Sequence, residues 1–96
     1  MFLCRMIAKG RVQGVNYRSF VCQHALALGI TGHVKNLPDD TVEILAEAKD
    51  RATLDSFKKL VSLKTNTPWG PYVDELVVES EDEAETSSYS SFEIAR

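Results

Sequence analysis

Cysteine is scarce in this sequence of 96 residues, which contains only Cys4 and Cys22. Their separation matches no zinc-ligand spacing, so the sequence predicts no metal site. With 44% apolar residues, the chain can build one hydrophobic core without metal or disulfide staples. Both cysteines fall at apolar positions, and we expect two buried thiols. A disulfide between them is the alternative, because their two segments are expected to be adjacent.

Long apolar runs are also missing. No stretch approaches the roughly 20 apolar residues of a membrane span. Arg5 interrupts the apolar N-terminus, which argues against a signal peptide. The length allows one domain, residues 1–96. We therefore expect a soluble, cytoplasmic, single-domain protein that is monomeric and has no membrane partner.

Acidic residues are absent from the first third of the chain. Residues 1–36 contain five basic residues and no carboxylate, whereas residues 37–96 contain all 14 acidic residues against six basic ones. The net charge of −3 argues against a nucleic-acid partner. A positive first third on an acidic protein suggests a small local anion site. The alternative is a chance distribution with an acidic C-terminal part.

The first third predicts a strand, a loop and a helix. Residues 2–9 alternate as a strand, and one of its faces is expected to lie on helices: Phe2, Cys4, Met6 and Ala8. Residues 10–16 predict a loop, with Asn16 as the N-cap of a helix that Gly29 closes. The stripe of this helix contains one polar residue: Tyr17, Phe20, Val21, His24, Ala25 and Leu28.

The rest of the chain predicts three more strands and one helix, then a short last strand. Residues 30–37 and 41–48 predict a hairpin in which Asp40 adopts a positive φ. Asp50 is expected to cap a helix over 51–63 with four buried residues: Leu54, Phe57, Leu60 and Val61. Strand 72–79 has a spacing between Val73 and Leu76 that suggests a bulge. Strand 89–95 is expected to bury Phe92 and Ile94.

This order, β-α-β-β-α-β with a final edge strand, is typical of one α+β fold class. It is the ferredoxin-like split βαβ arrangement, with two helices on one face of an antiparallel sheet. The prolines and glycine of segment 65–71 cannot continue the second helix. Trp69 is expected to pack under that helix, and a contact at the edge of a substrate is the alternative. The fold class hosts many functions and decides none of them.

Residues 10–18, with the sequence Gly-Arg-Val-Gln-Gly-Val-Asn-Tyr-Arg, carry the chemistry. A loop that leaves a strand and opens a helix presents unpaired N–H groups at the positive end of the helix dipole. Gly14 lets the backbone curl, and Arg18 can hold phosphate oxygens with two hydrogen bonds. The segment therefore predicts a phosphate-sized anion site. The alternative is an ordinary connection with a surface arginine, because the glycine spacing is not that of a P-loop.

The same nine residues resemble the first signature of the acylphosphatase family at every position. Residues 32–43 are similar to the second signature, and the resemblance spans nearly the whole chain. This region departs from the family pattern at His33, at Asp40 and, beyond residue 43, at Ala48, and the family uses none of these three positions for chemistry.

The resemblance implies hydrolysis of the carboxyl-phosphate bond of acyl phosphates by water, without metal or cofactor, and with inorganic phosphate as product and competitive inhibitor. It implies that Arg18 and Asn36 are the catalytic residues, Arg18 binding the phosphoryl group and Asn36 holding the attacking water. It implies a phosphate cradle made of six residues: Gln13, Gly14, Val15, Asn16, Tyr17 and Arg18.

Other functions and residues carry less weight. A non-catalytic module could keep the anion cradle, or an interaction domain could use the acidic surface of residues 74–85. An RNA-binding role lacks the paired exposed aromatic residues that stack on bases. His24 and Tyr17 are expected to be core residues, and His33 a surface histidine without a catalytic role.

Overall fold

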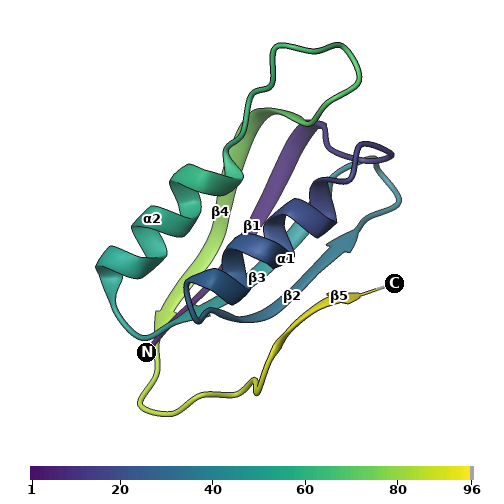
Figure 1. The fold of residues 1–96 in the computed structure, drawn as a ribbon. Coiled ribbons are helices and arrows are strands. Elements are labelled where there is room, and N and C mark those ends of the chain that lie inside the picture. Colours follow the sequence, from purple (N-terminus) through teal and green to yellow (C-terminus); the bar gives the residue numbers. More distant parts are fainter. Residues whose placement is uncertain (96) are drawn as a thin grey trace.

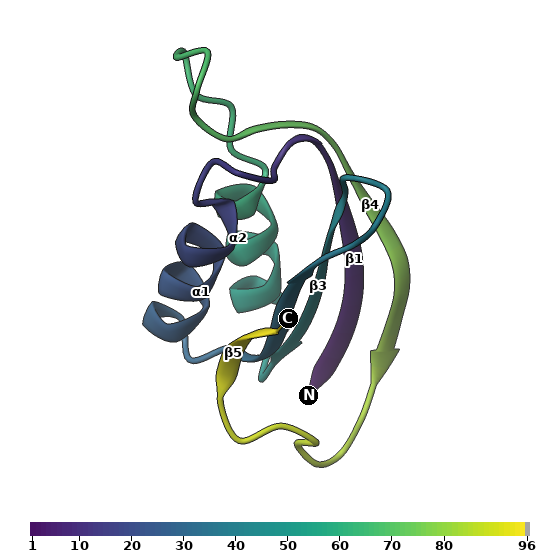
Figure 2. The same cartoon turned by 90° about the vertical axis from the view of Figure 1, so that its right-hand side faces the viewer.

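The computed structural model describes residues 1–95. The elements follow the order β1 (Phe2–Arg11), α1 (Tyr17–Ala27), β2 (Thr31–Asn36), β3 (Val42–Ala48), α2 (Arg51–Val61), β4 (Tyr72–Glu83) and β5 (Phe92–Ala95). The strands form one sheet in the order β4-β1-β3-β2-β5, and both helices cover the same face of it (Figures 1 and 2). The predicted ferredoxin-like fold is confirmed. Since β5 pairs parallel to β2, the sheet is mixed rather than wholly antiparallel.

The topology gathers three strand ends at one edge of the sheet. β1 and β2 are each antiparallel to β3 and therefore run parallel to each other, and β5 follows β2. The carboxyl ends of β1, β2 and β5 thus point the same way. α1 must return across the sheet between β1 and β2, so its N-terminus starts at that same edge. Residues that are distant in sequence meet there.

The helices bury most of the predicted positions. In α1, Tyr17, Val21 and Ala25 are buried, and in α2 the buried residues are Leu54, Phe57 and Val61. The prediction that Leu60 is buried was wrong, because its side chain is 37% exposed. Leu54, Phe57 and Val61 repeat at spacings of three and four and fill the contact with the sheet, and Leu60 lies beyond the edge of this stripe.

The predicted helix ends at Asp50 and Gly29 are confirmed. The Asp50 side chain accepts a hydrogen bond from the Thr53 N–H at 2.7 Å. Gly29 has φ +69°, and its N–H donates to Leu26 O at 3.3 Å while Ile30 N donates to Ala25 O at 2.8 Å. This pair of hydrogen bonds is a Schellman motif, and it turns the chain from α1 directly into β2.

β4 and β5 have different bounds from those predicted. The predicted bulge in β4 is confirmed at Asp74, and a second one lies at Glu79, where the register with β1 shifts again. β4 continues past Glu79 to Glu83, since pairing with β1 holds this polar segment at the sheet edge. β5 begins at Phe92 instead of residue 89.

The prediction that Trp69 packs under α2 was wrong. Its side chain is 76% exposed in a loop that projects beyond the sheet and helices (Figure 2). The Arg11 guanidinium holds this loop by donating to Gly70 O and Thr67 O, each at 2.7 Å. Main-chain carbonyls, rather than the indole, therefore fix the loop.

Both cysteines are free thiols, which excludes the disulfide alternative. Cys4 is fully buried, as predicted, and burial raises the pKa of its thiol. Cys22 is only partly buried, because it lies at the side of α1 near β5. Within residues 1–95, no helix has the length and apolar character needed to span a membrane.

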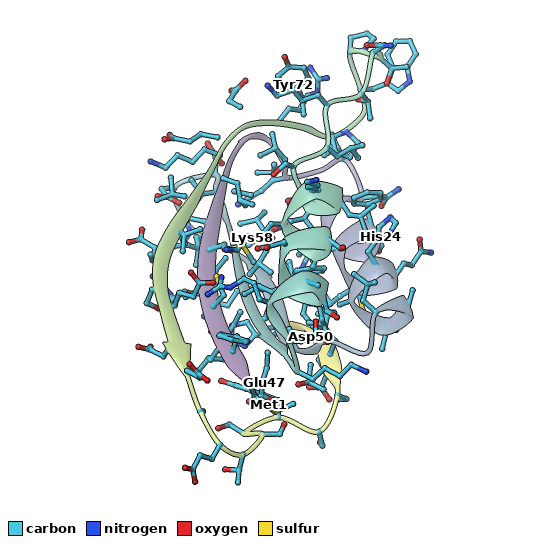
Figure 3. The ribbon with its side chains drawn as sticks, turned by 90° about the vertical axis from the view of Figure 1, so that its left-hand side faces the viewer. Met1, His24, Glu47, Asp50, Lys58 and Tyr72 are labelled. Atoms are coloured by element: carbon cyan, nitrogen blue, oxygen red, sulfur yellow. The ribbon has the colours of Figure 1, made fainter. Side chains whose placement is uncertain are left out.

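Glu47 is a buried carboxylate that sequence periodicity did not indicate. It is 2% exposed, and it lies near Met1 at the end of the sheet opposite Tyr72 (Figure 3). Its carboxylate accepts hydrogen bonds from the Thr31 hydroxyl at 2.8 Å, from the Ser88 N–H at 2.7 Å, and from Ser87 and Tyr89. Burial by itself raises the pKa of Glu47, but these hydrogen bonds together outweigh burial and lower it. The carboxylate thereby anchors the connection between β4 and β5.

We predict that Glu47→Gln lowers the free energy of unfolding by about 1–3 kcal/mol at pH 7, because an amide group cannot accept all of these hydrogen bonds. The folded pKa of Glu47 lies below its unfolded value, so the stabilisation is present above the unfolded pKa and is lost as the pH falls through the folded one. The stability difference between the two proteins should therefore shrink from neutral pH to about pH 3. Urea unfolding across this range measures it.

The control is Glu75→Gln, which changes an exposed carboxylate of β4 and should alter stability by no more than about 0.5 kcal/mol. A Glu47→Gln deficit that stays constant across the whole pH range would contradict the assignment.

Candidate active site

A pocket of about 400 Å³ opens at the edge where the three strand ends meet the start of α1. It receives residues from the loop after β1, the first turn of α1, the end of β2, and β5. The lining residues are Val12, Gly14, Asn16, Tyr17, Arg18, Ser19, Asn36 and Ile94. Both predicted catalytic residues, Arg18 and Asn36, are therefore in the wall of one pocket.

The loop before α1 turns through two left-handed residues. Gly14 has φ +73°, and a Cβ added to it would meet nothing within 4 Å, so the glycine is required by its conformation rather than by space. Asn16 follows with φ 62°. Asn16 is the N-cap residue of α1, as predicted, but its side chain makes no capping hydrogen bond. A left-handed backbone at this position does not have the extended geometry from which a side chain usually caps.

The first amides of α1 consequently have no partner within residues 1–95. The first helical hydrogen bond runs from Phe20 N to Asn16 O at 3.2 Å, and no side chain caps the amides of residues 17–19. The first turn of α1 contains no acidic residue that could offset the positive end of the helix dipole. Unpaired N–H groups at a helix start form an anion-binding surface, and here the residues that carry them line the pocket.

Gln13 connects this loop to the β2-β3 hairpin. Its side-chain amide Nε2 donates to Leu37 O at 2.8 Å and to Thr41 O at 2.9 Å. The side chain of Gln13 therefore positions the loop instead of lining the pocket. Val15, another residue of the predicted cradle, packs against the hydrophobic core. Any contribution of these two residues to anion binding has to come from their main chain.

Arg18 stands in the first turn of α1 and lines the pocket. None of the ion pairs within residues 1–95 involves it. A guanidinium with no carboxylate partner keeps all its donors available for an anion.

Asn36 comes from the end of β2 and brings an unusual oxygen to the same pocket. Its Oδ1 atom is buried and accepts no hydrogen bond within residues 1–95. A buried acceptor without a partner costs about 1–3 kcal/mol, so such an atom is uncommon outside functional sites. Its natural partner is a donor bound in the pocket.

Three lining residues were missed by sequence reasoning: Val12, Ser19 and Ile94. Ser19 could have been found, since it follows Arg18 in the first helical turn. Ile94 was predicted to be buried with Phe92, but it is 40% exposed whereas Phe92 is 4% exposed. Alternation along a strand correctly gives the two residues one face, but it does not tell where the covering helix ends.

The histidines and Tyr17 lie outside the polar part of this site. Tyr17 is 1% exposed, as predicted for a core residue, and its hydroxyl donates to Val61 O at 2.6 Å. His24 is half-buried and lies with its ring 4.4 Å from that of Phe20. Within the described part of the chain, no three His, Cys, Asp or Glu side chains gather as metal ligands.

The departures at His33 and Asp40 have local explanations. His33 Nε2 lies 2.8 Å from Glu43 Oε1, and Arg5 donates to the other oxygen at 2.7 Å. These hydrogen bonds lower the pKa of Glu43, and the one with His33 has the largest effect. Burial acts in the opposite direction but does not outweigh them. Asp40 adopts the predicted positive φ, 69°, so the hairpin turns without a glycine at this position.

We predict that Gln13→Ala lowers the free energy of unfolding by about 1–2 kcal/mol and speeds amide hydrogen exchange in residues 37–41. The reason is that two main-chain carbonyls lose their side-chain donor. Urea unfolding and exchange monitored by NMR measure both effects. Gln23→Ala, an exposed change on α1, is the matched control and should leave both unchanged. Equal behaviour of the two variants would refute the link between loop and hairpin.

Known proteins resemble this chain over most of its length. The model of the acylphosphatase family matches residues 4–94. An acylphosphatase of Caldivirga maquilingensis is 45% identical over 76 residues, 78% of this chain and 76% of that protein. One of Archaeoglobus fulgidus is 39% identical over 95 residues, covering 99% of both chains. The crystal structure of acylphosphatase from Bacillus subtilis has a TM-score of 0.85 and 36% identity, with all of both chains covered. On these grounds, the chain belongs to the acylphosphatase family.

Proposed function

We propose that the main-chain amides of residues 13–18, Arg18 and Asn36 carry out the acyl-phosphate hydrolysis that family membership assigns to this enzyme. One observation carries the proposal: a single pocket contains an uncapped helix start, an unpaired guanidinium, and the buried Oδ1 of Asn36 without a partner within residues 1–95. An acyl phosphate and a water molecule can supply the hydrogen-bond partner that each of these three features lacks.

The substrate places modest demands on the protein. The leaving group of an acyl phosphate is a carboxylate, which departs without a proton because its conjugate acid has a low pKa. No protein nucleophile and no metal are then needed, and catalysis consists of positioning and charge stabilisation. These are the two tasks for which a rigid set of N–H donors is suited.

Arg18 and the cradle amides bind the phosphoryl group. As the bond to the leaving oxygen lengthens, negative charge on the three equatorial oxygens is neutralised by fixed donors that need no reorganisation. The guanidinium adds two parallel hydrogen bonds, which a lysine could not give. The absence of any carboxylate from residues 1–36 leaves this positive field uncompensated.

Asn36 holds the attacking water. Its Oδ1 accepts a hydrogen bond from the water and so aims the water's oxygen at phosphorus, opposite the leaving oxygen. The proton leaves during attack for a phosphoryl oxygen or solvent, since the neutral carboxamide is not a base. A carboxylate in this position would repel the phosphoryl group, whereas an amide does not.

Inorganic phosphate, as the product, is expected to occupy the same cradle and to inhibit competitively. We further propose that the protein acts as a cytoplasmic monomer without a cofactor and without nucleic-acid or membrane partners. The net charge of −3 supports the lack of a nucleic-acid partner.

We predict that Arg18→Ala lowers kcat/KM for acetyl phosphate by about 10²–10³-fold and raises the inhibition constant of inorganic phosphate, because one charged contact to the transition state is lost. Arg18→Lys should recover only part of this loss, since an ammonium cannot form two parallel hydrogen bonds. Lys35→Ala is the control. It also removes a positive charge, but Lys35 precedes Asn36 on β2, so its side chain lies on the opposite face of the sheet from Asn36. Parent activity in Arg18→Ala would remove this residue from the mechanism.

We predict that Asn36→Ala lowers kcat by about 10²-fold while the inhibition constant of phosphate stays nearly unchanged, because only the water loses its position. Asn36→Asp should lower kcat and also weaken phosphate binding, since its carboxylate repels the anion. The split is measured by steady-state kinetics with phosphate as inhibitor, and Asn66→Asp in the exposed loop serves as control. Loss of phosphate binding in Asn36→Ala would show that Asn36 binds the anion instead.

A further inference from the structure

We propose that Ile94 contacts the acyl group of the bound substrate and makes the enzyme favour acyl phosphates with larger apolar acyl groups over acetyl phosphate. This inference rests on the proposed function, because it assumes that the phosphoryl group occupies the amides before α1. It concerns the part of the substrate that the phosphate cradle does not touch.

The sheet places Ile94 on the side of the helices and next to the catalytic strand. Ile94 is paired with Val34 of β2, which is fully buried beneath the helices, and Asn36 follows two residues later on β2. Because successive residues alternate between the two faces, Ile94, Val34 and Asn36 share a face. Ile94 therefore stands beside the residue that we propose holds the water.

Burial along β5 changes at this position. Phe92 has the same orientation and is 4% exposed, with its ring 6.2 Å from that of Phe57 in α2. Two residues later Ile94 is 40% exposed, since the strand has reached the edge where α1 begins and the pocket opens. Ile94 thus lines the pocket with a side chain that is not covered by the helices.

Ile94 is the one apolar side chain of the described lining that a ligand can cover. Val12 and Tyr17 also line the pocket, but each is only 1% exposed and is already packed in the core. The other contributions come from Gly14 and from polar residues. A phosphoryl group that lies on the amides must project its acyl group away from them. Among the described lining residues, Ile94 is the only one with exposed apolar surface against which such an acyl group can pack.

The remaining exposed large apolar residues lie elsewhere. Leu26, Leu60, Trp69 and Val78 are exposed, but none lines the pocket. Leu26 is a useful comparison, because it lies on α1 and is 60% exposed. Exposure alone is ordinary for a surface residue; exposure inside the pocket that holds Arg18 and Asn36 is what assigns a ligand contact to Ile94.

The test compares benzoyl phosphate with acetyl phosphate in wild-type enzyme and in Ile94→Ala. The ratio of the two kcat/KM values should fall about tenfold in Ile94→Ala, the lower end of the discrimination that one methylene group gives in an enclosed pocket, because this wall is partly open. The intrinsic reactivity of the two substrates cancels when the variant ratio is divided by the wild-type ratio. Inhibition by inorganic phosphate should stay nearly unchanged, because inorganic phosphate carries no acyl group.

Two variants with side chains of nearly equal shape show whether a change in the ratio comes from lost apolar contact or from a folding defect. Ile94→Val and Ile94→Thr differ by a methyl group against a hydroxyl group, so Val should keep most of the preference for benzoyl phosphate and Thr should lose it. Leu26→Ala is the control and should leave the ratio unchanged. A ratio that is the same in wild type, Ile94→Ala and Ile94→Thr would overturn the proposal, as would an equal loss on both substrates.

Failure of the proposed function has a different signature. If Arg18→Ala and Asn36→Ala hydrolysed both substrates at the wild-type rate, the phosphate cradle itself would be misplaced. An unchanged substrate ratio in Ile94→Ala, together with inactive Arg18→Ala, overturns only the role of Ile94.

Discussion

The site depends on the left-handed turn that leads from β1 into α1. Gly14 and Asn16 both have positive φ, so the chain enters the helix without an extended capping residue. This entry leaves the first helical amides unpaired at the positive end of the helix dipole. Left-handed backbone at a non-glycine residue and uncapped amides each cost free energy. In the proposed mechanism, the phosphoryl group is the partner that recovers this cost.

The split βαβ topology brings the other residues of the site to this turn. Because β3 lies between β1 and β2, the two parallel strands end at the same edge of the sheet, and the β2 end brings Asn36 to the start of α1. The Gln13 side chain then fixes the distance between loop and hairpin through two main-chain carbonyls. β5, the edge strand next to β2, adds Ile94 to the pocket. The hydrogen bonds of Glu47 hold the connection that leads from β4 to β5. Positioning in this enzyme is therefore a property of the whole sheet.

Local features of the fold were predictable because their causes lie within a few residues. Asp50 caps α2, Gly29 ends α1 and Asp40 turns the hairpin, each through its own backbone or side-chain chemistry. The failures share another cause. The burial of Leu60 and Ile94 depends on where a neighbouring element ends, and periodicity in one segment carries no such information.

The residues of the site could be predicted better than their arrangement in space. The motif of residues 10–18 indicated Arg18 and the cradle, but the meeting of Arg18 with Asn36 follows from strand order, which the sequence gives only through the fold class. Asn16 occupies the predicted N-cap position without the side-chain hydrogen bond of a usual cap, because the same residue type serves either an extended cap or a left-handed turn. Glu47 went unnoticed, since a buried carboxylate has no pattern of its own.

Binding of inorganic phosphate, followed by NMR of the main-chain amides, tests the central claim most directly. The account predicts that phosphate shifts the amide resonances of residues 14–19 in a saturable way and slows their hydrogen exchange, with smaller shifts at the end of β2. If the largest saturable shifts fell on another surface of the protein, or if the amides before α1 did not respond, the anion would not bind at this helix start and the mechanism would be wrong.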